Sequence, residues 1–148
     1  KMLRSAILDA GIDLKDIFVT NVLCCRPLNN VFPKDLEYIH SCNNWLYEEI
    51  KIIQPKIIVS IGGKAHKYVR QSDIGITQAA GIWEKHIFSF YNNEEKYEAY
   101  YMATLHPSFC MRGPDNRFDN HVMNLDRKGK ENLFREHIAS IINKQKEI

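Results

Sequence analysis

Two polar side chains lie in or next to predicted strands, and they are the groups best placed to do chemistry. Asn21 lies within an apolar, β-branched run at residues 17–24, and His106 follows a second run at residues 97–105. Both runs are typical of strands in an α/β sheet, where ligands bind beyond the carboxyl ends of the strands. A side-chain amide both donates and accepts hydrogen bonds, and an imidazole can do either. Each group can alternatively satisfy backbone groups or pack near a strand end.

The four cysteines are a second source of chemistry. The sequence has no signal peptide and no apolar run of the ~20 residues that a membrane span needs, so we expect an intracellular protein (cytoplasm, nucleoid or nucleus) with no membrane partner. Thiols stay reduced there, and are free, catalytic or metal-bound. Sixteen residues separate Cys25 from Cys42, and a loop followed by a helix can bring them together. Cys24 would point to the opposite face of an extended chain from Cys25 and is expected to lie in the core. Alternatively, all four cysteines, including Cys110, are small buried hydrophobic residues.

The size and composition indicate one globular domain. The chain has 148 residues, of which 45% are hydrophobic and 26% are charged. Such a chain can bury a core without disulfides. The net charge of +2 neither suggests nor excludes nucleic acid as a partner. The first residue is Lys rather than Met, so we expect a piece of a longer protein.

The apolar patterns predict alternating strands and helices. Strands are expected at residues 17–24, 56–61, 86–91 and 97–105, and helices at residues 3–10, 33–53, 64–70 and 130–144. Residues 75–81 are expected to be irregular, and residues 106–129 to form a long loop rich in Pro, Gly, Asn and Arg. This order predicts an α/β protein, specifically a three-layer α/β/α sandwich with a mostly parallel central sheet.

Three short segments occur in one order along the chain. They are Thr-Asn-Val-Leu-Cys-Cys-Arg-Pro at 20–27, Pro-Lys-Ile-Ile-Val-Ser-Ile-Gly at 55–62, and Leu-His-Pro-Ser at 105–108. Together with Cys42 they resemble the iron–sulfur uracil-DNA glycosylases of family 4. That family has a T-N-V-x-x-C-R-P segment, a second Cys in the following helix, a P-x-x-I-x-x-x-G strand and an H-P strand end. The resemblance covers roughly residues 10–112.

The resemblance implies roles for the polar residues. His106 would be catalytic and would donate to O2 of the departing uracil, where negative charge develops. Asn21 would read the edge of uracil, which shows an acceptor at O4 and a donor at N3. Ser108 and Arg112 would bind DNA. The resemblance thus implies a uracil-DNA glycosylase, a hydrolase of N-glycosyl bonds.

The resemblance also implies a [4Fe–4S] cluster. Cys25 and Cys42 would supply two of its four thiolate ligands. The family's leading Cys pair, and its Gly-Glu/Asp-Ala-Pro-Gly loop that handles the catalytic water, have no counterpart in this sequence. The chain is therefore expected to be the C-terminal two-thirds of one domain, residues 1–148, or a degenerate relative. The other two ligands would come from the missing N-terminal segment or a polypeptide carrying it, and the complete protein is expected to be monomeric.

The loop after His106 is a candidate DNA-binding loop. Its basic residues could hold phosphates, while Phe109 or Met111 could fill the gap left by a flipped base. An ordinary solvated loop is the alternative. The basic residues are Arg112, Arg117, Arg127, Lys128 and Lys130.

Three functions are weighed against each other. The first is a DNA repair glycosylase that hydrolyses the N-glycosidic bond of uracil flipped out of DNA. The second is a non-catalytic DNA-binding module of the same fold in a replication or processivity assembly, which the absent water loop favours. The third is an unrelated α/β protein that binds a nucleotide or small molecule. An assay on uracil-containing oligonucleotides separates the first two.

Overall fold

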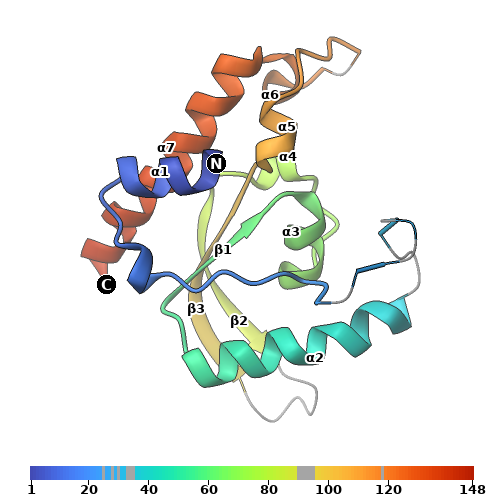
Figure 1. Ribbon diagram of the computed structural model, residues 1–148, viewed down its shortest axis with the longest axis vertical. Helices are drawn as coiled ribbons and strands as arrows, with labels where there is room; N and C mark the ends of the chain where they lie inside the picture. The colour runs from blue at the N-terminus through green and yellow to red at the C-terminus, as the bar shows by residue number, and fades with distance from the viewer. Residues whose placement is uncertain (25, 28, 30, 33–35, 90–95, 118) are drawn as a thin grey trace.

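A computed structural model describes residues 1–148 except 25, 28, 30, 33–35, 90–95 and 118, and describes the backbone alone for residues 36–44. Its strands are β1 (Ile57–Ile61), β2 (Trp83–Ser89) and β3 (Lys96–Thr104). Its helices are α1 (Met2–Asp9), α2 (Leu36–Ile53), α3 (Gly63–Arg70), α4 (Ile76–Ala79), α5 (Pro107–Cys110), α6 (His121–Asn124) and α7 (Arg127–Glu147), with a 3-10 turn at Leu14–Asp16 (Figure 1). Among the helices so described, none is long and apolar enough to cross a membrane.

The three strands form a mixed sheet in the order β1-β3-β2. β1 runs parallel to β3, with Ile57 opposite Tyr100 and Ile61 opposite Thr104. β2 runs antiparallel to β3. Only residues 90–95 separate β2 from β3, and so short a connection favours an antiparallel pair. The described sheet is therefore mixed, with one parallel and one antiparallel strand pair, and the predicted α/β class is confirmed.

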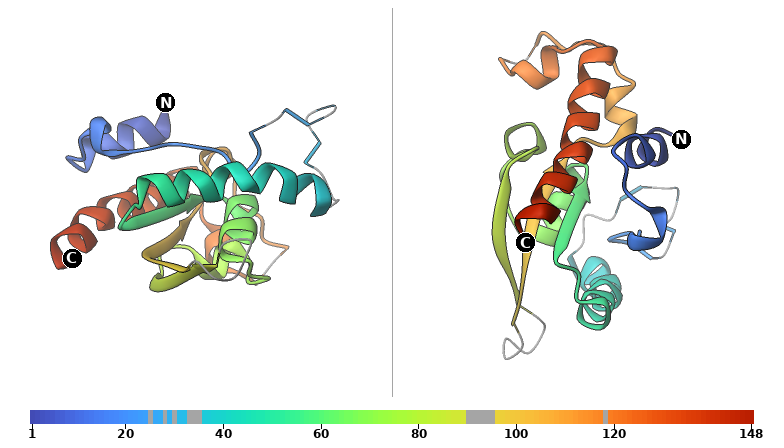
Figure 2. Two further views of the ribbon diagram at one scale, coloured as in Figure 1. Left: turned by 90° about the horizontal axis from the view of Figure 1, so that it is seen from below. Right: turned by 90° about the vertical axis from the view of Figure 1, so that its left-hand side faces the viewer.

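Helices cover both faces of the sheet (Figure 2). Side chains alternate along β3, so that Tyr101 and Ala103 belong to a core formed with α2 and α3. Thr104, by contrast, lies 3.0 Å from the ring of His137 on α7. The three-layer α/β/α arrangement predicted from the sequence is thus confirmed. Both layers lie beside the end of β3, where His106 follows.

The segment at residues 17–24 is not the buried strand that was expected. It is extended, but within the described residues it pairs with no strand, and Phe18 and Val19 are 57% and 68% exposed. The right-hand view of Figure 2 shows it passing on the β1 side of the sheet. An apolar run becomes a buried strand only where a neighbouring strand pairs with it and other elements cover its faces. The pattern alone cannot supply that neighbour.

Short helices replace much of the predicted irregular structure. Two short helices and the long helix α7 begin where a side chain caps a backbone N–H group: His106 for α5, Asn120 for α6 and Asp126 for α7. The loop expected at residues 106–129 therefore contains α5, α6 and the start of α7. Capping residues favour a helix start even when the apolar pattern is too short to indicate one. Residues 76–79, expected to be irregular, form α4.

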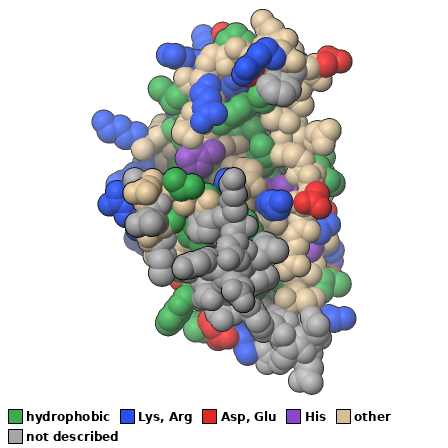
Figure 3. Space-filling model, turned by 90° about the vertical axis from the view of Figure 1, so that its right-hand side faces the viewer, with side chains coloured by type: hydrophobic (Ala, Val, Ile, Leu, Met, Phe, Trp, Pro, Cys, Tyr) green, Lys and Arg blue, Asp and Glu red, His purple; other side chains and the backbone are tan. Residues whose placement is uncertain are grey.

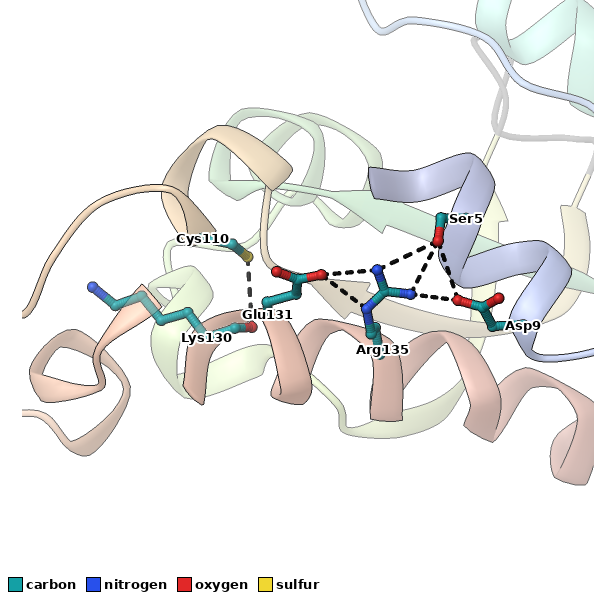
Figure 4. Close-up of polar contacts among 6 residues, drawn as sticks. All are labelled: Ser5, Asp9, Cys110, Lys130, Glu131 and Arg135. Carbon is teal, nitrogen blue, oxygen red and sulfur yellow. Dashed lines mark hydrogen bonds and ion pairs between the residues drawn. The ribbon is translucent and has the colours of Figure 1, made fainter. Parts of the chain in front are cut away.

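An ion-pair network attaches α1 to α7 (Figure 4). The Arg135 guanidinium lies 2.7 Å from a carboxylate oxygen of Asp9 and 2.8 Å from one of Glu131. It also donates to the hydroxyl of Ser5. Beneath this network, apolar residues of both helices pack with Leu105, the residue before His106. The network thus closes the core that lies under the end of β3.

Candidate functional site

His106 lies directly after β3, at the amino end of α5. Leu105 is fully buried, while the His106 side chain is exposed. The His106 backbone is extended, with φ −82° and ψ 138°, as a residue before proline prefers. The buried strand end and Pro107 together fix where the exposed imidazole projects.

Hydrogen bonding fixes which nitrogen of His106 carries the proton. Nδ1 accepts from the backbone N–H of Ser108 at 3.1 Å and lies 2.7 Å from the Ser108 hydroxyl oxygen. A backbone N–H can only donate, so Nδ1 must present a lone pair. The neutral ring therefore carries its proton on Nε2. The side chain is exposed and no bond to Nε2 is seen among the described residues, so Nε2–H can donate to a ligand.

Gly62 lies tightly against the His106 ring. A Cβ on Gly62 would lie 2.9 Å from Cβ of His106 and 3.4 Å from its Cδ2. Gly62 has a φ of +89°, which disfavours other residues. Its N–H donates to the carbonyl of Thr104 at 2.8 Å, which joins the ends of β1 and β3. The sequence predicted a tight turn here but gave no sign that the turn supports a histidine.

A buried polar cluster holds the start of α3 against the sheet. The Tyr101 hydroxyl contacts the hydroxyl of Ser60 and Nδ1 of His66, the latter at 2.8 Å. The backbone N–H of His66 donates to the Gly62 carbonyl. Burial lowers the pKa of His66 and raises that of Tyr101 to about 12. Folding therefore favours neutral His66, and its contribution to stability is lost as pH falls below about 6.5.

Asn21 lies in the extended segment at residues 17–24, on the β1 side of the sheet, and its side chain is exposed. Its neighbour Val22 packs against the core formed by α2 and α3, while Ile17 packs against the core under α7. The segment is therefore anchored on both sides of Asn21. No contact between Asn21 and His106 is seen in the described part of the chain, so their meeting in one site stays a prediction.

The segment after α5 exposes some of the predicted DNA-contacting residues and hides others. Arg112 is exposed, and Met111 is 58% exposed. Phe109 is partly buried in the core under α7, so it is not free to act as a wedge. Lys130 is only 1% exposed and cannot hold phosphates as expected. Figure 3 shows Lys and Arg side chains gathered on the upper part of the face that carries α3 and α5.

Arg117, another predicted phosphate contact, is paired within the chain. Its guanidinium lies 2.7 Å from a carboxylate oxygen of Asp115. Hydrogen bonding from Arg117 lowers the pKa of Asp115 to about 2. The pair is largely solvated, since the Arg117 side chain is 82% exposed. Arg117 could therefore exchange Asp115 for a phosphate at little cost.

The cysteines are only partly described. Cys25 lies outside the described residues, and for Cys42 only its backbone in α2 is described. Cys110 is buried, and its thiol donates to the Lys130 carbonyl, so it is a packing residue. Cys24 is exposed, which corrects its expected place in the core. Within the described ranges, no group of three or more His, Cys, Asp or Glu side chains could hold a metal ion.

Comparison with known proteins identifies similar chains. The profile of the uracil DNA glycosylase superfamily matches residues 1–128. A Type-4 uracil-DNA glycosylase of Sulfurisphaera tokodaii is 33% identical over 117 residues, covering 72% of this chain and 47% of that protein. Another from Thermotoga maritima is 27% identical over 136 residues, covering 91% and 66% respectively. The chain thus spans about half to two-thirds of these relatives' length.

Replacing Gly62 by alanine tests its support of His106. We expect Gly62→Ala to lower the free energy of unfolding by roughly 1–3 kcal/mol, because alanine disfavours the positive φ and its methyl group collides with His106. The His106 ring signals in an NMR spectrum should shift as well. Gly75→Ala is the matched control, since Gly75 has a negative φ and open space around it. Equal stability of the two variants, with unshifted His106 signals, would contradict this role.

Proposed function

Because the chain belongs to the uracil-DNA glycosylase superfamily, we propose that it acts in DNA repair by hydrolysing the bond between uracil and deoxyribose. The relatives named as Type-4 uracil-DNA glycosylases support this activity. The observation that carries the proposal is the geometry of His106. Its Nε2–H is exposed at a strand end, held by Gly62 and by the Ser108 backbone.

In this proposal His106 stabilises the leaving group. When the C1′–N1 bond breaks, its electron pair stays with uracil, and negative charge spreads to O2. Water adds its oxygen to C1′, and the proton it loses balances the charge of the uracil anion. A fixed N–H donor aimed at O2 stabilises the developing charge without having to reorganise. None of the described residues is assigned to activate the water.

Asn21 reads the base in this proposal. A base must leave the helix stack before an enzyme can reach its glycosidic bond, and its pairing edge is then exposed. The Asn21 amide can donate to O4 and accept from N3–H, whereas cytosine presents the opposite pattern. The exposure of Asn21, between the anchoring residues Ile17 and Val22, is consistent with this task. Ser108 and Arg112, both exposed, would bind the flanking DNA backbone.

A [4Fe–4S] cluster would be structural in this protein. Cys25 and Cys42 would hold it with two thiolates from a segment that this sequence does not contain or from a separate polypeptide. Cys110 is not assigned as a ligand, since it is buried and its thiol donates to the Lys130 carbonyl. When bound, the cluster would tie the segment around residue 25 to α2, and no redox step is required for hydrolysis.

The function is tested by uracil excision. With the full-length protein and uracil-containing oligonucleotides, we expect His106→Ala to cut the single-turnover rate by roughly 10²–10³-fold, the cost of losing one such donor. His121→Ala removes another exposed histidine, on α6, and should leave the rate within about twofold. A much smaller loss in a folded His106→Ala protein would remove His106 from catalysis. No excision by the wild-type protein would favour a non-catalytic DNA-binding module.

Base selectivity tests Asn21. A carboxylate at position 21 cannot donate to O4, so we expect Asn21→Asp to reduce kcat/KM on uracil by roughly 10–100-fold, the cost of one or two hydrogen bonds. The preference for uracil over cytosine should fall with it. Asn29→Asp makes the same chemical change at another exposed asparagine and serves as the control. Unchanged selectivity in Asn21→Asp would place Asn21 outside the site.

Iron content tests the cluster. In the full-length protein, we expect Cys42→Ser to lower bound iron, brown visible absorption and thermal stability together, because a thiolate ligand is lost. Cys24→Ser is the control, since Cys24 is adjacent to Cys25 and is exposed. Iron content that is the same in both variants would end the cluster assignment. These readouts do not depend on glycosylase activity.

A further inference from the structure

Lys130 is buried in an unusual way for a lysine. It lies in the first turns of α7, and only 1% of it is exposed. Lysine is almost never so buried unless its charge is satisfied. Figure 4 shows its side chain extending from α7 away from Arg135, toward the chain that follows α5.

The ammonium group is satisfied by the backbone after α5. Nζ lies 2.8 Å from the carbonyl oxygen of Gly113 and 3.3 Å from that of Arg112. It also lies 4.6 Å from the centre of the Phe109 ring, a distance suited to a cation–π contact. Two carbonyls and one aromatic face thus match the three N–H donors of the ammonium group.

The same residue holds α5 through its own backbone. The Cys110 thiol donates to the Lys130 carbonyl, with sulfur and oxygen 3.6 Å apart. Burial raises the pKa of Cys110, so the thiol keeps the proton it donates. α5 carries His106 at its amino end. Lys130 therefore links α7 both to the helix that begins at His106 and to the segment that follows that helix.

The two carbonyl contacts constrain which way the segment faces. Because the carbonyls of Arg112 and Gly113 both point inward to Nζ, this stretch of backbone has little freedom to turn. The Arg112 N–H also donates to the Phe109 carbonyl, which completes the turn. With its backbone fixed in this way, Arg112 presents its side chain to solvent, and Met111 is exposed beside it.

We propose that Lys130 is a positioning residue for DNA binding: its buried ammonium holds residues 111–113 so that Met111 and Arg112 face the DNA beside the base at His106. Burying a charge costs free energy, and an apolar side chain of similar length would fill the same space. Unlike an apolar side chain, the ammonium holds the carbonyls of Arg112 and Gly113 in place. It also places a positive charge next to the segment that carries Met111 and Arg112. The DNA-binding part of this inference rests on the proposed function, whereas the ordering of residues 111–113 does not.

The first test measures the order of the segment in the full-length protein without DNA. Lys130→Met keeps the length of the side chain but removes the charge and its donors. We expect amide hydrogen exchange at residues 111–113 to speed up about tenfold, since local opening no longer breaks the ammonium contacts. Lys146→Met removes the same charge from an exposed position in the last turn of α7 and should leave this exchange unchanged. Unchanged exchange in Lys130→Met would overturn the proposal.

The second test separates positioning from simple stability. We expect Lys130→Met to raise KM for a uracil-containing oligonucleotide about tenfold, because the segment must then be ordered on binding. The kcat should change by less than about threefold, because Gly62 and Ser108 still hold His106. Lys130→Gln removes the charge but keeps an NH2 group with two donors, so we expect its exchange rate and KM to fall between those of wild type and Lys130→Met. Lys130→Gln replaces Lys130→Met if the latter does not fold. Faster exchange with an unchanged KM would refute the DNA-facing role.

The two tests distinguish this inference from the proposed function. If wild-type protein does not excise uracil, the glycosylase proposal fails, while hydrogen exchange still tests whether Lys130 orders the segment. The KM arm is then replaced by the Kd for an undamaged oligonucleotide. A Kd that is the same for wild type and Lys130→Met would refute a role in DNA binding of any kind.

Discussion

The close contact between Gly62 and His106 is the constraint on which the rest of the site depends. It brings together the ends of two parallel strands, because Gly62 follows β1 directly and His106 lies just after β3. The backbone bond from Gly62 to Thr104 holds the strand ends in register, and the Ser108 N–H holds the ring from its other side. An exposed imidazole is ordinarily mobile, but this one has a fixed position and a fixed donor. Catalysis by charge stabilisation requires such a donor.

Support for this contact comes from both faces of the sheet. On one face, the buried Ser60–Tyr101–His66 cluster anchors the first turn of α3, which starts at Gly63. On the other face, α7 packs under Leu105 and holds the following segment through Lys130. The helices on both faces of the sheet therefore support Gly62 and His106 at one end of the sheet. The same helices that build the core position the candidate site, so stability and function are coupled at this edge.

Much of this architecture is predictable from the sequence, because it depends on local patterns. The apolar run before Gly62 predicts a strand there, and the run before His-Pro-Ser predicts a histidine just beyond a strand end; the structure has both. The segment around Asn21 is not the predicted buried strand, because burial of a strand depends on a neighbour that its own residues do not encode. The expectation that Lys130 contacts phosphate is wrong for a similar reason. Its burial arises from carbonyls about seventeen residues earlier in the chain, which no periodicity indicates.

The central claim is that the imidazole held by Gly62 and the amide of Asn21 meet at one extruded pyrimidine. A crystal structure of the full-length protein bound to an oligonucleotide with a non-hydrolysable 2′-fluoro-deoxyuridine tests it most directly. The account predicts Nε2 of His106 at about 2.7–3.1 Å from O2 of the uracil, with the Asn21 amide at its O4 and N3. A uracil held elsewhere, or an Asn21 side chain turned away from a base that His106 contacts, would contradict it.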